Sequence, residues 1–240
     1  MSSVKKANKR FQFKQFTIED KGCGMPVSTD GVLLGAWAHA SGDASILDIG
    51  TGTGLLALMM AQRFPSADIT ALDIDLHAVK AAKYNAEQSA WAKRIYVAHQ
   101  DVKSWKSTDT FDVIICNPPY FNSGLQAEDA RRAMARHTDS LSHDDLLNVL
   151  ASRLSRNGVA YLILPSYEAD QLIAKSHQHH LFCCRTVDVK TTPTKPVNRK
   201  LIALSANKKN ETDKEMLIIQ SDNSYTKEFV ALTKDFYLKM

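Results

Sequence analysis

The clearest chemical signal in the sequence is a run of four residues: Asn117, Pro118, Pro119 and Tyr120. The run follows directly on 111–116, an apolar segment typical of a buried central strand. The side-chain oxygen of Asn117 and the carbonyl oxygen of Pro118 are two acceptors, and adjoining prolines hold that backbone stiffly. The Tyr120 ring can stack on a planar group, which is worth about 1–3 kcal/mol for a nucleobase, and Phe121 can add apolar surface. These residues suit a planar amine.

Group transfer to such an amine would explain these residue types. The nitrogen lone pair is delocalised, so two acceptors on both N–H groups favour the charge that develops as the nitrogen becomes tetrahedral. No strong general base is needed, because the cationic product loses its proton easily, and orientation supplies much of the rate. An ordinary Asn-Pro turn explains the first two residues but not the second proline and the aromatic residue. The motif alone does not separate adenine, guanine and the amide of glutamine.

A glycine-rich turn between an expected strand and an expected helix is the second signal. Its residues are Asp48, Ile49, Gly50, Thr51, Gly52, Thr53 and Gly54. Glycines let the backbone approach a ligand closely, and the helix that follows presents free N–H groups. The spacing is G-x-G-x-G rather than the G-x-G-x-x-G of dinucleotide sites, and a Walker A motif is absent. The turn therefore disfavours a nicotinamide oxidoreductase.

Acidic residues follow the next two expected strands. Asp73 ends 68–73, about twenty residues after the glycines, where a carboxylate can accept both hydrogen bonds of a ribose diol. Asp101 follows 94–98 and could accept from an adenine amine, although a capping or surface role explains it nearly as well. Asp75 is better explained as a helix N-cap. With the glycine turn, these acids predict a ligand that contains a nucleoside.

Alternating strands and helices must position these residues. The expected strands are 45–49, 68–73, 94–98, 111–116, 159–163, 182–189 and 200–206, with 216–219 as a candidate for one more. The expected helices are 55–64, 76–89, one that begins after Ser142, 167–176 and 225–237. This order predicts an α/β, Rossmann-like fold with right-handed crossovers. Ligands bind such folds beyond the carboxyl ends of the strands, where both loops lie.

Two segments stand apart from this alternation. Residues 1–40 are expected to form a basic segment and a lid or substrate-facing appendage, and residues 41–240 the main domain. The polar stretch from Asn117 to about Ser140 is too long for an ordinary turn, which indicates a functional loop.

The chain is mildly basic, with a net charge of +4 and a pI of about 8.8. The positive charge is clustered at Lys5, Lys6, Lys9, Arg10 and Lys14, at Arg131, Arg132 and Arg136, and at Lys190, Lys195, Arg199 and Lys200. A solvated face explains any one cluster equally well, but three clusters in one chain indicate a phosphate-binding surface.

Composition and cysteine usage limit the setting in which the protein works. No stretch approaches the roughly 20 apolar residues that cross a bilayer, so no membrane association is expected. The N-terminus lacks the apolar core of a secretory signal, and the four cysteines form no Cys-x-x-Cys pair, which favours a reduced, cytoplasmic setting. The histidines, including His177, His179 and His180, lack partners at ligand spacing, so no metal is expected.

Residues 46–56, 71–75 and Asp101 resemble the nucleotide-binding motifs of class I S-adenosylmethionine-dependent methyltransferases. The resemblance implies a mostly parallel seven-stranded sheet with helices on both faces, and S-adenosyl-L-methionine as cofactor. It assigns the cofactor's amino-acid part to Gly50, Gly52 and Gly54, its ribose to Asp73 and its adenine amine to Asp101. Asp48 would orient the loop or reach the methionyl ammonium through water. Asn117 is expected to touch the cofactor as well as the target amine.

Four segments resemble, more narrowly, the bacterial valine-tRNA adenine N6-methyltransferases: 28–37, 117–121, 135–142 and 225–237. The resemblance covers essentially the whole chain. It implies methylation of N6 of adenosine 37, immediately 3′ of the anticodon, a loop nucleotide that costs less to extrude than one in a duplex. Contacts to the anticodon arm are then expected from Pro119, Phe121, Lys5, Lys6, Lys9, Arg10, Arg131, Arg132, Arg136 and Arg199.

Other functions stay open on the residues alone. Enzymes that methylate a glutamine of protein release factors share Asn-Pro-Pro-Tyr, but they carry a sizeable helical N-terminal domain, whereas about 40 residues precede the first strand here. A ribosomal RNA or DNA amine is a further target. A non-catalytic RNA-binding domain is disfavoured by the intact Asn117 and the three glycines. The oligomeric state is not determined, and a monomer is favoured.

Overall fold

The computed structural model describes residues 9–23, 26–118, 141–208 and 211–240. Several residues predicted to form the site lie outside these ranges: Lys5, Lys6, Pro119, Tyr120, Phe121, Arg131, Arg132 and Arg136. Of the predicted functional loop, 117 to about 140, the structure describes Asn117 and Pro118. Within the described ranges, no helix is long and apolar enough to cross a membrane.

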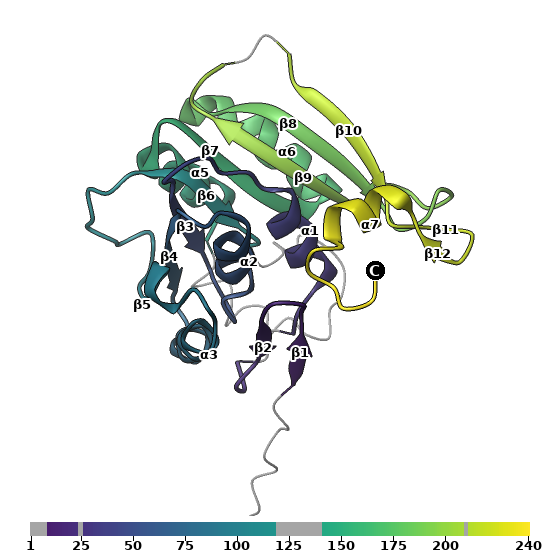
Figure 1. Ribbon diagram of the computed structural model, residues 1–240. Coiled ribbons are helices and arrows are strands. Elements are labelled where there is room, and N and C mark those ends of the chain that lie inside the picture. The colour runs from purple at the N-terminus through teal and green to yellow at the C-terminus, as the bar shows by residue number, and fades with distance from the viewer. Residues whose placement is uncertain (1–8, 24–25, 119–140, 209–210) are drawn as a thin grey trace, which may run out of the picture.

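An eight-stranded sheet runs through the molecule (Figure 1). In order across the sheet, its strands are β10 (Asp213–Ile218), β8 (Phe182–Lys190), β9 (Arg199–Ser205), β7 (Leu154–Pro165), β6 (Phe111–Cys116), β3 (Ser45–Ile49), β4 (Asp68–Asp73) and β5 (Ile95–His99). All neighbouring pairs are parallel except those of β9, which is antiparallel to both β7 and β8. The α/β fold and the mostly parallel sheet are confirmed.

The sheet has one strand more than the predicted seven, β10, and this strand overlaps the candidate at 216–219. This strand is parallel to β8: Asp213 lies opposite Arg185 at one end of the pairing and Ile218 opposite Lys190 at the other. Four of its six residues are exposed, so it lacks the buried apolar pattern on which the strand predictions rest. Elsewhere β3, β4 and β6 have the predicted bounds, whereas β7 begins at Leu154 rather than at residue 159.

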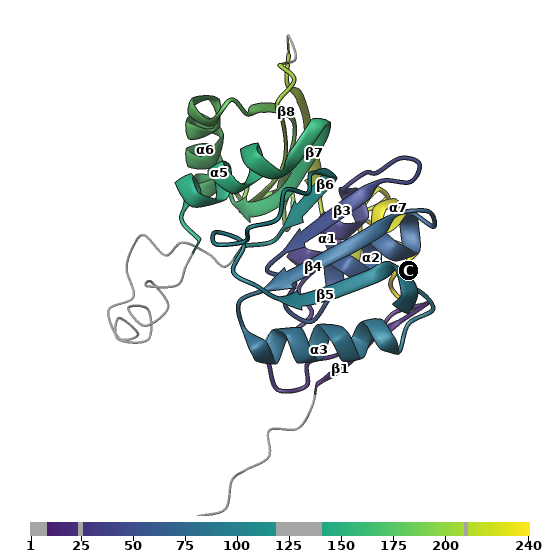
Figure 2. The ribbon, with the colours of Figure 1, turned by 90° about the vertical axis from the view of Figure 1, so that its left-hand side faces the viewer.

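Helices cover both faces of the sheet (Figure 2). One face packs against α1 (Thr29–Trp37), α2 (Leu55–Arg63), α3 (Leu76–Glu87) and α7 (Lys227–Thr233). The other face packs against α5 (His143–Arg153) and α6 (Ser166–Ser176). Strand side chains alternate between the faces, so Val113 and Ile115 of β6 join the first core and Ile114 joins the second. Helices on both faces are therefore confirmed.

The N-terminal segment contains elements that the sequence did not predict. A hairpin of β1 (Arg10–Gln12) and β2 (Thr17–Glu19) lies beside α3, at the lower edge of Figure 1. Helix α1 follows, and its residues Val32, Leu33 and Leu34 are at most 1% exposed. This helix forms part of the core rather than a cover over it. The domain boundary at residue 40 stays a prediction.

Short elements complete the fold. Two single turns of 3-10 helix span Ala92–Arg94 and His177–His179. A two-residue hairpin, β11 (Gln220–Ser221) and β12 (Ser224–Tyr225), precedes α7, which is shorter than the predicted helix 225–237.

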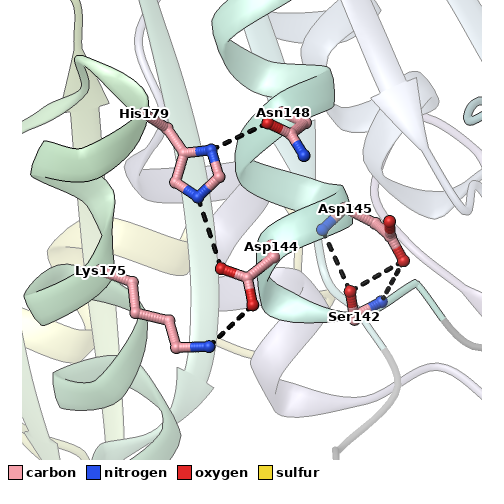
Figure 3. Close-up of polar contacts among 6 residues, drawn as sticks. All are labelled: Ser142, Asp144, Asp145, Asn148, Lys175 and His179. Carbon is pink, nitrogen blue, oxygen red and sulfur yellow. Dashed lines mark hydrogen bonds and ion pairs between the residues drawn. The ribbon is translucent and has the colours of Figure 1, made fainter.

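Helix α5 is anchored firmly where the described chain resumes after residue 140 (Figure 3). Ser142 is its N-cap and forms a capping box, as the sequence predicted for the cap. The Asp144 carboxylate accepts from Lys175 Nζ at 2.8 Å and lies 3.4 Å from Nε2 of His179, whose Nδ1 is 2.9 Å from Oδ1 of Asn148. The hydrogen bond from Lys175 lowers the pKa of Asp144. The chain therefore leaves the loop region at a fixed point.

Candidate active site

The carboxyl ends of β3, β4 and β6 meet at one edge of the sheet. In the strand register Ile49 pairs with Leu72 on one side and with Cys116 on the other. The residues that come next after Ile49, Leu72 and Cys116 are therefore neighbours at this edge: Gly50, Asp73 and Asn117. The topology thus brings the two predicted loops together, as the alternation of strands and helices requires.

The glycine turn is held on the end of β4. The amides of Gly50 and Thr51 both donate to the carbonyl of Leu72 at 2.9 Å. Gly50, Gly52 and Gly54 all have positive φ, at 69°, 57° and 82°. A Cβ on Gly50 would meet nothing within 4 Å, whereas one on Gly54 would lie 3.3 Å from Cα of Ala82. Gly50 therefore borders open space, and Gly54 permits the close approach of α3.

Asp48 is a buried carboxylate with one oxygen unsatisfied. Its side chain is fully buried, and its Oδ2 accepts from Thr51 Oγ1 at 2.6 Å and from the Ala57 amide at 3.2 Å. Its Oδ1 has no hydrogen-bond partner among the described residues. Burial raises the pKa of Asp48 to about 7, with a smaller contribution from Asp73. An unpaired buried oxygen is costly, which suits a site that a ligand donor completes.

Asp73 organises the turn that faces it. Its Oδ2 accepts from the Gly52 amide and its Oδ1 from the Asp75 amide, both at 2.8 Å. Burial raises the pKa of Asp73, and the two amide hydrogen bonds oppose that rise. Asp75 is the N-cap of α3 and accepts from the His77 amide at 2.8 Å, which confirms its predicted capping role. The Asp73 oxygens keep further lone pairs for a ligand.

Two more features lie beside Asp73. Asp101, after β5, accepts from the Lys103 amide at 2.9 Å through Oδ1, so part of its carboxylate serves a local turn. Ile74 immediately follows Asp73 and is 49% exposed, an apolar surface that a planar ring could cover. Sequence reasoning missed Ile74. The signal was available, because an isoleucine directly after an acid predicted to bind a ligand stands at the carboxyl edge of the sheet.

Asn117 lies against the first turn of α1. The Nδ2 atom of Asn117 is 3.8 Å from the position that a Cβ on Gly31 would take. Ser28 caps this helix and accepts from the Gly31 amide at 3.1 Å. Pro118 is buried. The start of α1 is therefore part of the wall around Asn117. This helix was not predicted from the sequence. The signal that could have indicated it is Ser28, followed by Asp30 and an apolar run.

The described cations of the predicted RNA surface have different surroundings. Arg10 is exposed in β1, and the Lys9 amide donates to Asp20 Oδ1 at 3.2 Å. Arg199 Nε donates to Asp30 Oδ2 at 2.7 Å, so its charge has an acidic partner. Among the described residues, no group of three His, Cys, Asp or Glu side chains could hold a metal ion.

Comparison with known proteins gives the class of the chain. Residues 31–163 match the methyltransferase small domain family. The fold is similar to that of a predicted O-methyltransferase from Agrobacterium tumefaciens, with a TM-score of 0.68, 18% identity, and coverage of 86% of this chain and 96% of that one. It is also similar to a class I S-adenosylmethionine-dependent methyltransferase from Listeria monocytogenes, with a TM-score of 0.60, 17% identity, and coverage of 90% and 75%. The fold is therefore that of class I methyltransferases.

Full-length relatives give the particular family. A tRNA1(Val) (adenine(37)-N6)-methyltransferase of Vibrio cholerae is 50% identical over 240 residues and 100% of both chains. One of Bacteroides thetaiotaomicron is 44% identical over 98% of this chain and 99% of its own. The chain belongs to the tRNA1(Val) (adenine(37)-N6)-methyltransferase family.

Proposed function

We propose that this chain catalyses the reaction for which its full-length relatives are named. It transfers a methyl group from S-adenosylmethionine to N6 of adenine 37 in tRNA1(Val). The observation that carries the proposal is the position of Asn117, directly beside the glycine turn at the carboxyl edge of the sheet. An acceptor for a planar amine and a site for a nucleoside-containing cofactor thus share one edge.

The residues at this edge fit S-adenosylmethionine. The unpaired Oδ1 of Asp48 would accept from the methionyl ammonium, directly or through water, and the open space beside Gly50 would take the amino-acid part. Asp73 would hold the ribose diol, with Ile74 against the adenine and Asp101 near its amine. When bound, the cofactor supplies an activated methyl group on a sulfonium.

The chain's own residues would orient the target amine. The side-chain oxygen of Asn117 and the carbonyl oxygen of Pro118 would accept its two N–H groups and stabilise the positive charge that develops on the nitrogen. Tyr120 would stack on the base and hold its plane. Because the nitrogen loses its proton easily after transfer, no side chain is needed as a general base. Orientation of the amine toward the cofactor is then the main source of the rate.

The basic residues would bind the anticodon arm. Lys9, Arg10 and Arg199 are described, and Lys5, Lys6 and the Arg131, Arg132 and Arg136 cluster complete the proposed set. Phosphate contacts of this kind fix the register of the RNA and make its affinity depend on salt. A monomeric enzyme in the cytoplasm stays the prediction.

The direct test is transfer of a labelled methyl group. The protein is incubated with radiolabelled S-adenosylmethionine and total tRNA from a strain that lacks the gene, and the tRNA is then digested to nucleosides. Label in N6-methyladenosine of valine tRNA, absent with Asn117→Ala, supports the proposal. Parallel reactions offer a release factor or ribosomal RNA in place of tRNA. Label there but not in tRNA would overturn the substrate and leave the proposed role of the catalytic loop unchanged.

A further inference from the structure

Asn85 is a buried amide that joins three elements. It lies in α3 and is 1% exposed. Its Oδ1 accepts from the Glu19 amide at 3.0 Å, and its Nδ2 donates to the Glu19 carbonyl at 3.0 Å and to the Thr53 carbonyl at 2.8 Å. One side chain thus hydrogen-bonds to backbone groups of both the β1–β2 hairpin and the glycine turn.

Position 85 requires a side-chain amide, because the contacts there use both a donor and an acceptor. An aspartate could accept from the Glu19 amide but would set a carboxylate against two carbonyl oxygens. An alanine would leave the backbone groups of Glu19 and Thr53 without these partners, which is unfavourable where water is largely excluded. The other inward residues of α3 include Val79, Ala82 and Ala86, so packing alone needs no polar residue here.

On one side, Asn85 acts on the cofactor turn. Thr53 is 5% exposed and stands between Gly52, which Asp73 holds, and Gly54, which lies against Ala82. The carbonyl of Thr53 is therefore fixed by α3 at the point where the turn enters α2. The conformation of the turn and the position of α3 depend on each other.

On the other side, Asn85 acts on the hairpin. Lys21 extends the contact, because its Nζ lies 3.5 Å from the centre of the Tyr84 ring and 2.9 Å from the Glu19 carboxylate. Asp20 binds Lys9, the residue directly before β1. Its amide donates to the Lys9 carbonyl at 3.0 Å, and its Oδ1 accepts from the Lys9 amide. Lys9 and Arg10 are, with Lys14, the described cations of the N-terminal cluster.

We propose that Asn85 is a positioning residue that couples the cofactor turn to the N-terminal hairpin, so that cofactor and RNA each tighten the binding of the other. The RNA half of this inference rests on the proposed function. The coupling is reciprocal by thermodynamic linkage, so it is measurable from either ligand. Hydrogen bonds link Asn85 with Thr53, Asn85 with Glu19, and Lys9 with Asp20, and the peptide bond between Glu19 and Asp20 joins the last two pairs.

Hydrogen exchange on the unmodified protein tests the first half without RNA. Saturating S-adenosylmethionine should slow exchange of the Glu19 amide and of the peptide 16–22, in addition to the glycine turn. Unchanged exchange in 16–22 with clear protection of the turn would overturn the coupling. This measurement does not depend on methylation of tRNA, so its outcome is separate from that of the proposed function.

Affinity measurements test the second half. In the unmodified protein, S-adenosylmethionine should tighten valine tRNA binding by a factor of at least about five. In Asn85→Ala and Asn85→Asp the factor should fall to about one, and cofactor affinity should weaken by about tenfold or more. Glu87→Ala, an exposed change on the same helix, is the matched control and should keep both values. If S-adenosylmethionine increases tRNA affinity by the same factor in the Asn85 variants as in Glu87→Ala, the proposal is overturned.

A second variant covers the case in which the Asn85 changes prevent folding. Asp20→Ala removes the acceptor that holds the Lys9 and Gly22 amides and leaves Asn85 unchanged. It should reduce the effect of cofactor on tRNA affinity while cofactor affinity alone stays near that of the unmodified protein. A full effect of cofactor in this variant would contradict the proposed route through the hairpin.

Discussion

Asp30 in the first turn of α1 and Arg199 at the start of β9 form an ion pair of 2.7 Å across 169 positions of sequence. Both side chains are largely buried, at 16% and 25% exposed. Arg199 pairs in register with Pro165 at the carboxyl end of β7, and α1 begins beside Asn117. The pair therefore fixes the wall of the candidate site, and the charge expected to meet RNA already has an acidic partner.

Substitutions at this pair separate an RNA contact from a scaffold role. If Arg199 also binds a phosphate, Arg199→Ala should weaken tRNA binding and lower the slope of log affinity against log salt by about one. Asp30→Asn should strengthen tRNA binding, because it releases the Arg199 charge. Filter binding over a salt series measures both. A lower melting temperature of Arg199→Ala with an unchanged salt slope would mean that Arg199 does not contact RNA. A double-mutant cycle should then give a coupling free energy between Asp30 and Arg199 of about 1 kcal/mol.

Asn117→Ala should abolish methyl transfer and leave cofactor affinity near normal. Loss of one acceptor aimed at the developing charge is expected to lower kcat by about 100- to 1000-fold or more. Single-turnover transfer and calorimetric titration of S-adenosylmethionine measure the two effects. Lost cofactor binding with a normal fold would mean that Asn117 serves the cofactor rather than the amine.

Asp73→Ala should weaken cofactor binding by roughly 10- to 100-fold, as expected for lost hydrogen bonds to a charged group. Part of this loss comes from the Gly52 amide, which Asp73 holds in the turn. Asp75→Ala is the control, because the Asp75 side chain caps α3 and only its backbone amide, which alanine keeps, donates to Asp73. Equal cofactor affinity in Asp73→Ala and the unmodified protein would exclude Asp73 from the ribose.

Asp48 should make stability depend on pH. Its pKa rises from 3.8 to about 7 through burial, so the folded protein holds a proton more tightly than the unfolded chain. The free energy of unfolding should therefore decrease as the pH rises from about 4 to about 7, by at most ~1.4 kcal/mol per pH unit for this group. Asp73, whose pKa also rises, contributes in the same direction.

Asp48→Asn isolates the Asp48 contribution. Urea unfolding across this pH range should show a flatter profile in the variant, because the amide cannot titrate. Saturating cofactor should flatten the profile of the unmodified protein as well, since a nearby ammonium favours the ionised carboxylate. Parallel profiles for the two proteins would show that Asp48 does not titrate in this range.

The N-terminal cations should contribute mainly to RNA affinity. Replacement of Lys5, Lys6, Lys9 and Arg10 by alanine should weaken tRNA binding and reduce its salt slope, because fewer counterions are released. Transfer at saturating tRNA should stay close to that of the unmodified protein. An unchanged affinity and slope would assign the cluster to a solubilising face.

The sequence by itself determined the chemistry and most of the order of elements. Buried parallel strands are continuous apolar runs, so β3, β4 and β6 were predicted with their observed bounds, and the loops that follow them could be assigned to one edge. Asn117, Asp73 and the glycines could be predicted as site residues because their types and spacing reflect local chemistry. The edge strand β10 was predicted only as a candidate at 216–219, and its first residues were not predicted, because it is largely exposed.

Only the tertiary structure decided which distant residues meet. The pairing of Asp30 with Arg199, and of Asn85 with both Glu19 and Thr53, depends on how α1, α3 and the hairpin pack, and no local pattern encodes such a pairing. That Oδ1 of Asp48 has no hydrogen-bond partner in the described part of the chain likewise follows from burial, which sequence spacing does not measure. Local periodicity specifies elements and their edges, whereas contacts across the chain arise from the burial of several elements against one core.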